Sequence, residues 1–219
     1  MSNWIIQQKW SELVFISYEV DKDLLKKALP EQLEPDLYEG KAYVSIVPFV
    51  MSDIKFFFSP VLPFSKLFEL NLRTYVRYKG KKGIFFFTLD SNHRLGNFIA
   101  RNFFHLPYRY SNLRLIKEHQ SLKFYESNSI DVEVKTTNED LECRLSTWLT
   151  ERYSLYTVSG KRVFRGDVIH DPWKLNKCEL KKFTDTFSYE FGFPSNGQHL
   201  HLAYSPGLDV RFIPFKRVE

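Results

Sequence analysis

Residues 69–78 (ELNLRTYVRY) alternate strictly between two kinds of side chain. One set is polar or aromatic and consists of Glu69, Asn71, Arg73, Tyr75 and Arg77. The other set is mostly apolar and consists of Leu70, Leu72, Thr74 and Val76. A period of two is typical of a β-strand whose two faces have different surroundings. The segment is therefore predicted to be a strand with a row of polar groups along one face.

The residues that follow extend this strand into a larger unit. A glycine-containing turn at 79–83 leads to an apolar strand at 84–89, and the two strands are expected to pair as a hairpin. Ser91 or Asn92 then caps a predicted helix that ends before Pro107. The apolar side chains of this helix, at helical spacing, are Leu95, Phe98, Ile99 and Phe103.

The rest of the chain is predicted to contain many strands and few helices. Further strands are predicted at 13–20, 42–50, 112–118, 121–126, 130–135, 152–158, 162–169, 199–204 and 208–215. Helices are predicted at 23–29, 139–150 and 177–187, and a long irregular loop at 51–68. This pattern predicts one α+β domain over residues 1–219, built on mainly antiparallel sheet that closes or nearly closes into a barrel.

Composition favours the same fold class and restricts the partners. The chain has 21 Phe and 12 Tyr, and aromatic residues favour strands. The net charge of +5 is spread without a dense basic block, so we expect no nucleic-acid partner. No apolar run reaches the roughly 18 residues of a membrane span, and the first ten residues do not resemble a signal peptide. With only Cys143 and Cys178, far apart, we expect a cytoplasmic protein without membrane contact.

The polar face of residues 69–78 is the main site candidate. Alternate residues of a strand lie about 6.6 Å apart, so neighbours in the row can hold one small ligand together. If the face points into a barrel, Glu69 can act as a general base and Arg73 can clamp a carboxylate or phosphate. The alternative is a solvated strand face, or an ion-pair network without a ligand.

Other polar residues could contribute to a site. His170 could supply an acid or base, as histidines in general can near neutral pH, and the alternative is a hydrogen-bonded core or turn histidine. A helix–strand junction carries three polar residues that can complete a pocket or form a buried structural network, namely Glu151, Arg152 and Tyr153. His199 and His201 lie on one face of a predicted strand and would need a third ligand to hold zinc, so we expect neither a metal nor a cofactor.

Several motifs in a fixed order carry a resemblance to a known family. They are Leu-Pro-Glu-Gln-Leu at 29–33, ELNLRTYVR at 69–77, ARNFFHLPY at 100–108, LTERYSLY at 149–156 and HDPWKL at 170–175. In this order and spacing the chain resembles the YqjF-like family of uncharacterised bacterial proteins, within the acetoacetate-decarboxylase-like superfamily. The resemblance implies an antiparallel β fold of two similar halves around a central cavity.

The decarboxylases of this superfamily carry a glutamate and a Schiff-base lysine in that cavity. Glu69 resembles the glutamate, and Arg101 with Leu106-Pro107 resembles the approach to the lysine, whose position is occupied by Tyr108. A phenol cannot form an imine with a ketone. The resemblance therefore implies the fold without the decarboxylase reaction, and any catalysis by Glu69 and Tyr108 would be acid–base chemistry of the hydrolase, hydratase or isomerase type.

These observations predict a cavity for a small oxygenated or carboxylated molecule. We expect Asn71, Arg73, Arg101, Glu151 and His170 to contact the ligand, and we leave open whether the protein is an enzyme. The competing interpretation is a structural or interaction protein whose cavity is filled by side chains. Self-association through the aromatic-rich segment 56–68 also remains open.

Overall fold

The computed structural model describes residues 4–57, 66–94, 96–98, 101, 105–126, 129–195 and 197–218. The strands are β1 (Ile6–Val20), β2 (Glu34–Pro35), β3 (Ala42–Phe56), β4 (Leu67–Tyr78), β5 (Lys81–Ser91), β6 (Tyr108–Tyr110), β7 (Arg114–Glu118), β8 (Ser121–Glu126), β9 (Ile130–Asp140), β10 (Ser154–Ser159), β11 (Arg162–Ile169), β12 (Asn176–Asp185), β13 (His201–Phe212) and β14 (Lys216–Arg217). The helices are α1 (Lys22–Ala28), α3 (Arg144–Thr150) and a 3₁₀ helix, Ser188–Phe191. Residues 94, 96–98 and 101 are also helical.

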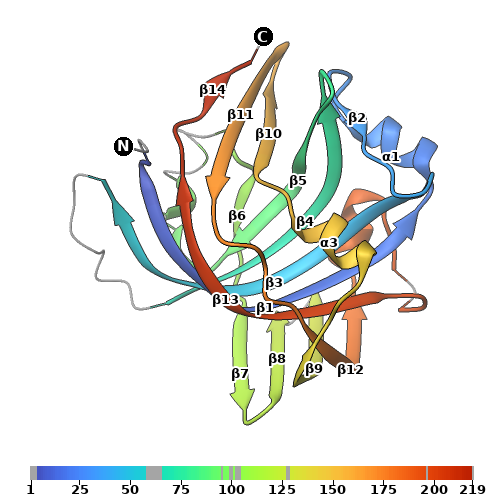
Figure 1. Ribbon diagram of the computed structural model, residues 1–219, viewed down its shortest axis with the longest axis vertical. Coiled ribbons are helices and arrows are strands. Elements are labelled where there is room, and N and C mark those ends of the chain that lie inside the picture. The colour runs from blue at the N-terminus through green and yellow to red at the C-terminus, as the bar shows by residue number, and fades with distance from the viewer. Residues whose placement is uncertain are drawn as a thin grey trace.

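The sheet closes on itself to form a barrel. Strands β11, β10, β5, β4, β3, β1 and β13 are hydrogen-bonded in that order, and β13 pairs back with β11 at Val168↔Phe212 (Figure 1). Most pairs are antiparallel, while β10–β5 and β5–β6 are parallel. The predicted fold class, α+β with a mainly antiparallel closed sheet, is confirmed.

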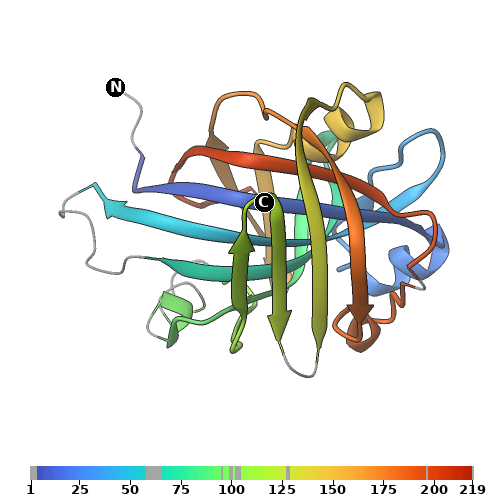
Figure 2. The ribbon, with the colours of Figure 1, turned by 90° about the horizontal axis from the view of Figure 1, so that it is seen from below.

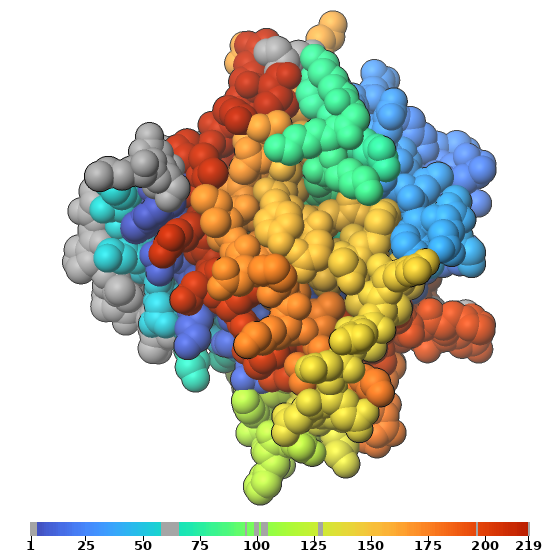
Figure 3. All heavy atoms as spheres, viewed as in Figure 1, coloured from blue at the N-terminus to red at the C-terminus, as the bar shows by residue number. Residues whose placement is uncertain are grey.

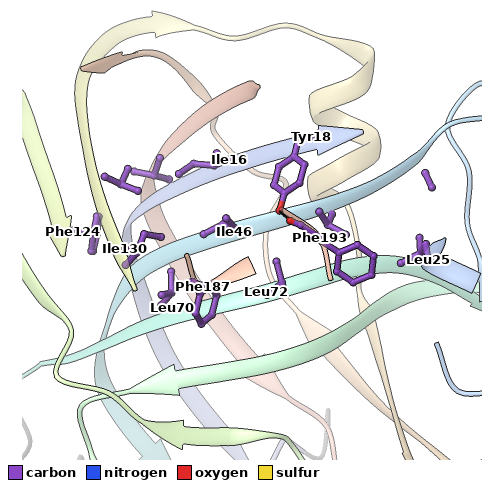
Figure 4. Packing of buried hydrophobic residues seen from close by; sticks show 14 of the residues in the cluster. Ile16, Tyr18, Leu25, Ile46, Leu70, Leu72, Phe124, Ile130, Phe187 and Phe193 are labelled. Atoms are coloured by element: carbon purple, nitrogen blue, oxygen red, sulfur yellow. Dashed lines mark hydrogen bonds between the residues drawn. The ribbon is translucent and has the colours of Figure 1, made fainter. Parts of the chain in front are cut away.

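Four further strands continue the sheet beyond β13 and form what we call the wing: β12, β9, β8 and β7. The wing crosses the long barrel strands β1, β3 and β4 on their outer side (Figure 2). Ile16, Ile46 and Leu72 of the barrel belong to one buried cluster with Phe124 and Ile130 of the wing (Figure 4). The outer face of these barrel strands is therefore buried, as is their inner face.

The inner faces of the same strands bury a second set of side chains. On β1, Leu13 and Phe15 belong to an interior cluster, while Ile16, next along the chain, faces the wing. On β3, Val47 and Phe49 likewise point inward. Burial on both faces explains why β1 and β3 contain nearly continuous apolar runs, whereas β4 alternates because its inward set is polar.

The predicted helix at 177–187 is wrong, because these residues form β12 and the start of the turn after it. β12 pairs with β9 over most of its length, from Asn176↔Asp140 to Asp185↔Ile130. Cys178 and Leu180 alternate with exposed charged residues, which is a strand period. A register shift between Leu180 and Lys182 then moves the next apolar side chain, Phe183, out of phase and imitates helical spacing.

The predicted hairpin around Ser205-Pro206-Gly207 is also wrong, because β13 runs straight through these residues. Ser205 pairs with Leu13 and Gly207 pairs with Ser11, so the ladder to β1 skips only Pro206 and Glu12. Proline has no N–H to donate, and Glu12 takes a φ of 54° at the opposite position. β13 therefore continues through the proline that sequence reasoning took as a chain reversal.

Other predicted elements begin or end at different residues in the structure. The irregular loop predicted at 51–68 is strand at 51–56 and again from residue 67, and residues 58–65 lie outside the described residues. The helix predicted at 139–150 begins only at Arg144, because β9 extends to Asp140. Helix α1 and its Asp21 cap are confirmed, with Asp21 accepting bonds from the N–H groups of the next turn. Leu95, Ile99 and Phe103, three of the four apolar positions predicted for the helix after Ser91, lie outside the described residues.

No helix of the described residues is both long and apolar enough to pass through a bilayer.

Substituting Gly207 tests the continuous path of β13. Gly207 has a φ of +133°, and a β-carbon there would lie 2.1 Å from the carbonyl oxygen of Trp10. Gly207→Ala should therefore lower the free energy of unfolding by at least about 2 kcal/mol, since strain and a backbone clash add. Urea unfolding measures this change. Pro206→Ala, at an exposed neighbouring position, is the control and should change stability by less than about 1 kcal/mol. Equal effects of the two substitutions would contradict the described path.

Candidate functional site

A cavity of about 120 Å³ lies inside the closed barrel. Every strand of the closed ring contributes to its lining, through residues such as Leu13, Val47, Asn71, Leu89, Leu155, Val168 and Phe212. A single water needs roughly 10–15 Å³ on the same measure, so the space can hold several waters or a small organic molecule. Segments of α3, β10 and β11 cover the middle of the molecular face nearest the viewer in Figure 3.

The cavity separates two apolar clusters of the barrel interior. Trp10, Leu13 and Phe49 on one side belong to the cluster that includes Phe15. Ile84 and Leu155 on the other side belong to a cluster that also contains Tyr75. The walls are therefore mainly aliphatic and aromatic, as in most small-molecule sites.

The polar row of β4 forms one wall of this cavity. Glu69, Asn71 and Arg73 all line it, and all three are buried, with 3%, 3% and 8% of their surface exposed. Their even-numbered neighbours Leu70 and Leu72 face the outer cluster under the wing. The alternation seen in the sequence thus separates a dry packing face from a polar interior face.

Glu69 is bound by two neighbouring side chains. The Tyr108 hydroxyl donates a hydrogen bond of 2.7 Å to its Oε2, and the Asn71 amide donates one of 3.5 Å to its Oε1. Burial raises the pKa of Glu69 to about 7, and Asp90 adds to the rise, while the two hydrogen bonds and Arg73 oppose it. Glu69 therefore exchanges a proton close to neutral pH.

Tyr108 is placed beside Glu69 by a short strand that joins the edge of β5. β6 pairs with β5 in parallel at Leu89↔Tyr108, directly after Pro107. Burial and the adjacent Glu69 raise the pKa of Tyr108 well above its usual range. The phenol therefore stays protonated and acts as a hydrogen-bond donor rather than as a titrating acid.

Arg73 is a buried cation that forms no salt bridge among the described residues, although its charge lowers the pKa of the nearby Glu69. Among the described residues its guanidinium makes no hydrogen bond or ion pair, and its Nε is fully enclosed without an acceptor. The ring of Phe15 lies 5.2 Å from its Cζ, which offsets part of the cost of burial. The Oδ1 atom of Asn71 also has no donor in the described part of the chain. The β4 wall thus carries polar atoms that the folded chain leaves unsatisfied.

Arg152 also lines the cavity, where its guanidinium packs on the ring of Tyr75 of β4. Its Nη1 donates to the fully buried Asp36 at 2.6 Å, and its Nε donates to the carbonyl of Trp148 at 2.8 Å. Its Nη2 has no acceptor among the described residues. Both residues were candidates in the sequence, but the ligand contact was predicted at Glu151, because a junction between helix and strand does not reveal which of two successive charged side chains points inward.

The remaining predicted site residues lie in different places. His170 lines the cavity and stacks on Tyr153 at 4.6 Å between ring centroids. Glu151 lies beside the cavity rather than in its lining, where it accepts bonds from the Tyr153 hydroxyl and the Trp173 backbone N–H. Arg101 is exposed on the helical segment after β5. The structure therefore gathers Glu69, Asn71, Arg73, Tyr108 and His170, but not Arg101 or Glu151, around one space.

The described residues contain no group of three or more His, Cys, Asp or Glu side chains arranged to hold a metal ion. His201 is half-buried and pairs with the Ser146 hydroxyl at 2.8 Å, while His199 is exposed. Burial lowers the pKa of His201. The two histidines therefore lie in separate surroundings. Of the described residues that line the cavity, none is a lysine.

Acetoacetate-decarboxylase-like proteins of known structure have a fold similar to that of this chain. The chain resembles the acetoacetate decarboxylase of Legionella pneumophila at 14% identity with a TM-score of 0.71, covering 98% of this chain and 87% of that one. It resembles the enduracididine biosynthesis enzyme MppR, complexed with pyruvate, at 11% identity with a TM-score of 0.69, covering 100% and 92%. At these identities the likeness shows the fold.

The chain belongs to the DUF2071 family of uncharacterized conserved proteins, whose family model matches residues 7–209. It is 36% identical over 229 aligned residues to the uncharacterized protein YqjF of Bacillus subtilis, covering 98% of this chain and 93% of that protein. The resemblance seen in the sequence motifs is thereby confirmed.

The raised pKa of Glu69 predicts a specific pH dependence of stability. The pKa is 4.5 for an ordinary glutamate and about 7 in the folded protein, so the folded state binds this proton more tightly than the unfolded state. The stability from this group is complete below pH 4.5 and is lost as pH rises through 7. Glu69→Gln removes the titration. Its free energy of unfolding relative to the parent protein should therefore rise by about 2 to 3 kcal/mol between pH 5 and pH 8.

Urea unfolding at both pH values measures this difference. Glu12→Gln, which removes a carboxylate that bonds Tyr204 and Lys117 outside the cavity lining, is the control for general effects of charge. Parallel stability curves for the parent and Glu69→Gln would contradict the buried, proton-exchanging state of Glu69.

Proposed function

We propose that this protein binds a small organic carboxylate in the barrel cavity, with Arg73 as the anchor. The observation that carries the proposal is the buried Arg73 guanidinium, which lines the cavity without a salt bridge or hydrogen-bond acceptor among the described residues. Arginine stays charged at every physiological pH, so its burial without an anion is costly. A carboxylate fits the planar guanidinium with two parallel hydrogen bonds and removes that cost.

The surrounding walls support a ligand with a small apolar body. Leu13, Val47 and Phe49 face Ile84 and Leu155 across the cavity, so the part of the ligand away from its carboxylate meets hydrocarbon. The enzyme MppR, which has a similar fold, is complexed with pyruvate, itself a small carboxylate. This likeness supports the size and class of the ligand and leaves its identity open.

Glu69 and Tyr108 support acid–base chemistry on that ligand. A carboxyl group with a pKa of about 7 can accept or release a proton near neutral pH, which suits a general acid or base. Tyr108 donates to one oxygen of Glu69 and leaves the other within reach of Asn71 alone. We propose proton transfer of the hydrolase, hydratase or isomerase type. Imine chemistry has no support, because no lysine lines the cavity in the described part of the chain.

The competing function is a structural or interaction protein whose barrel interior is filled. That interpretation predicts a space of a few tens of cubic ångströms at most and satisfied interior polar groups. The cavity of about 120 Å³ and the unpaired atoms of Asn71, Arg73 and Arg152 favour the binding function. We also propose a cytoplasmic location, which two separate free cysteines support.

Arg73→Met tests the binding function through opposite effects on stability and binding. Removing a buried, unpaired cation while keeping a long apolar side chain should raise the free energy of unfolding of the ligand-free protein by about 1 kcal/mol. The same substitution should abolish stabilisation by carboxylates such as butyrate, which in the parent protein should raise the melting temperature. Differential scanning fluorimetry with and without 10 to 50 mM butyrate, roughly the range needed for a weak ligand, measures both effects.

Arg165→Met is the control, because Arg165 pairs with Asp167 outside the cavity. It should leave the response to butyrate unchanged. Loss of stability in ligand-free Arg73→Met, together with no response of the parent protein to any small carboxylate, would favour the structural interpretation.

A further inference from the structure

Two cationic groups, and not one, face the cavity. The charged side chains of its lining are Glu69, Arg73 and Arg152, with His170 as a further titratable group. Arg73 forms no salt bridge in the described part of the chain. The only carboxylate that pairs with Arg152 among the described residues is Asp36, and Arg77 also donates to Asp36 at 2.6 Å. One carboxylate therefore serves two guanidinium groups behind Arg152.

Arg152 is held rigidly and retains a donor that the fold does not use. Its side chain is 4% exposed, and its Cζ lies 4.2 Å from the ring centroid of Trp148 and 5.2 Å from that of Tyr75. Nη1 and Nε are occupied by Asp36 and the Trp148 carbonyl, while Nη2 has no acceptor among the described residues. A buried charged donor without an acceptor is costly, and an acceptor from a ligand would remove that cost.

The two arginines reach the same space from different elements. Arg73 lies on β4, two residues or about 6.6 Å along the strand from Tyr75, and the ring of Tyr75 is the surface on which Arg152 rests. Arg152 lies in the short segment between α3 and β10. Because the two guanidinium groups come from different elements and each keeps a donor without an acceptor among the described residues, each is suited to an anionic group of its own.

We infer that the ligand is a dicarboxylate with a short carbon chain, one end bound by Arg73 and the other by Arg152. This inference rests on the proposed carboxylate site and specifies its substrate class. Leu13, Ile84 and Leu155 supply an apolar wall for the carbons between the two ends. Glu69 is hydrogen-bonded by Tyr108 and Asn71 and forms no salt bridge with Arg73. Asp36 holds Nη1 of Arg152, but Nη2 stays available for the second carboxylate.

The test is isothermal titration calorimetry of the full chain with matched ligands. Succinate and glutarate carry two carboxylates, monomethyl succinate keeps the skeleton of succinate with one charge fewer, and methyl phosphate carries two charges on one group. Succinate or glutarate should bind at least about tenfold more tightly than monomethyl succinate, since a charge-assisted hydrogen bond contributes about that factor.

Variants then locate the second carboxylate. Arg152→Lys keeps the charge but loses the planar fork, and it should weaken dicarboxylate binding about tenfold while leaving monomethyl succinate unchanged. Arg77→Lys is the matched control, because Arg77 shares Asp36 but does not line the cavity, and it should change neither affinity. The comparison of ligands on the parent protein decides the inference even if Arg152→Lys does not fold.

Three results would overturn the inference. Equal affinities for succinate, glutarate and monomethyl succinate would mean that the protein does not recognise a second carboxylate, while the proposed site for the first would stand. Tighter binding of methyl phosphate than of any dicarboxylate would mean that both arginines bind one doubly charged group rather than two separate carboxylates. An equal loss of both affinities in Arg152→Lys would make Arg152 a structural residue. If none of the carboxylates binds, the proposed function itself fails together with this inference.

Discussion

Packing of the wing against the outside of the barrel is the constraint on which the rest of this structure depends. Phe124 and Ile130 cover the outward side chains of β1, β3 and β4, including Leu72. A strand with alternating residues can bury its apolar set only by turning its other set the opposite way. Once the wing occupies the outer face, Glu69, Asn71 and Arg73 must point into the barrel, far from bulk water.

Placing these groups in a dry interior determines their chemistry. Burial shifts Glu69 toward its protonated form and keeps the phenol of Tyr108 protonated. The two side chains therefore interact through a hydrogen bond and not through an ion pair. Arg73 cannot respond in the same way, because a guanidinium does not lose its proton in proteins. The fold therefore keeps the permanently charged Arg73 near the Glu69 carboxyl group, which can exchange a proton. This arrangement costs stability, and charged groups held at such a cost are common at functional sites.

The sequence predicted the local features that depend on period and turn chemistry. The alternation at 69–78, the Asp21 cap and the hairpin between β4 and β5 all follow from neighbouring residues. It did not predict features that depend on distant pairing. β12 looked helical because a register shift displaced Phe183. β13 looked like a hairpin because Ser-Pro-Gly is common in turns, whereas its straight path depends on pairing with β1. The ligand contact was predicted at Glu151 rather than Arg152, because the direction of Arg152 depends on Asp36 and Trp148. The motif resemblance supplied the barrel cavity that periodicity alone could not.

The most direct test of a carboxylate site at Arg73 is a crystal structure of the protein soaked with 3-bromopropionate, with anomalous data collected at the bromine edge. The described geometry predicts a bromine peak inside the barrel, among Leu13, Ile84 and Leu155, and carboxylate oxygens at hydrogen-bond distance from the Arg73 guanidinium. A cavity filled by rearranged side chains, or bromine only at the molecular surface, would contradict the proposal that the polar row of β4 is a binding site.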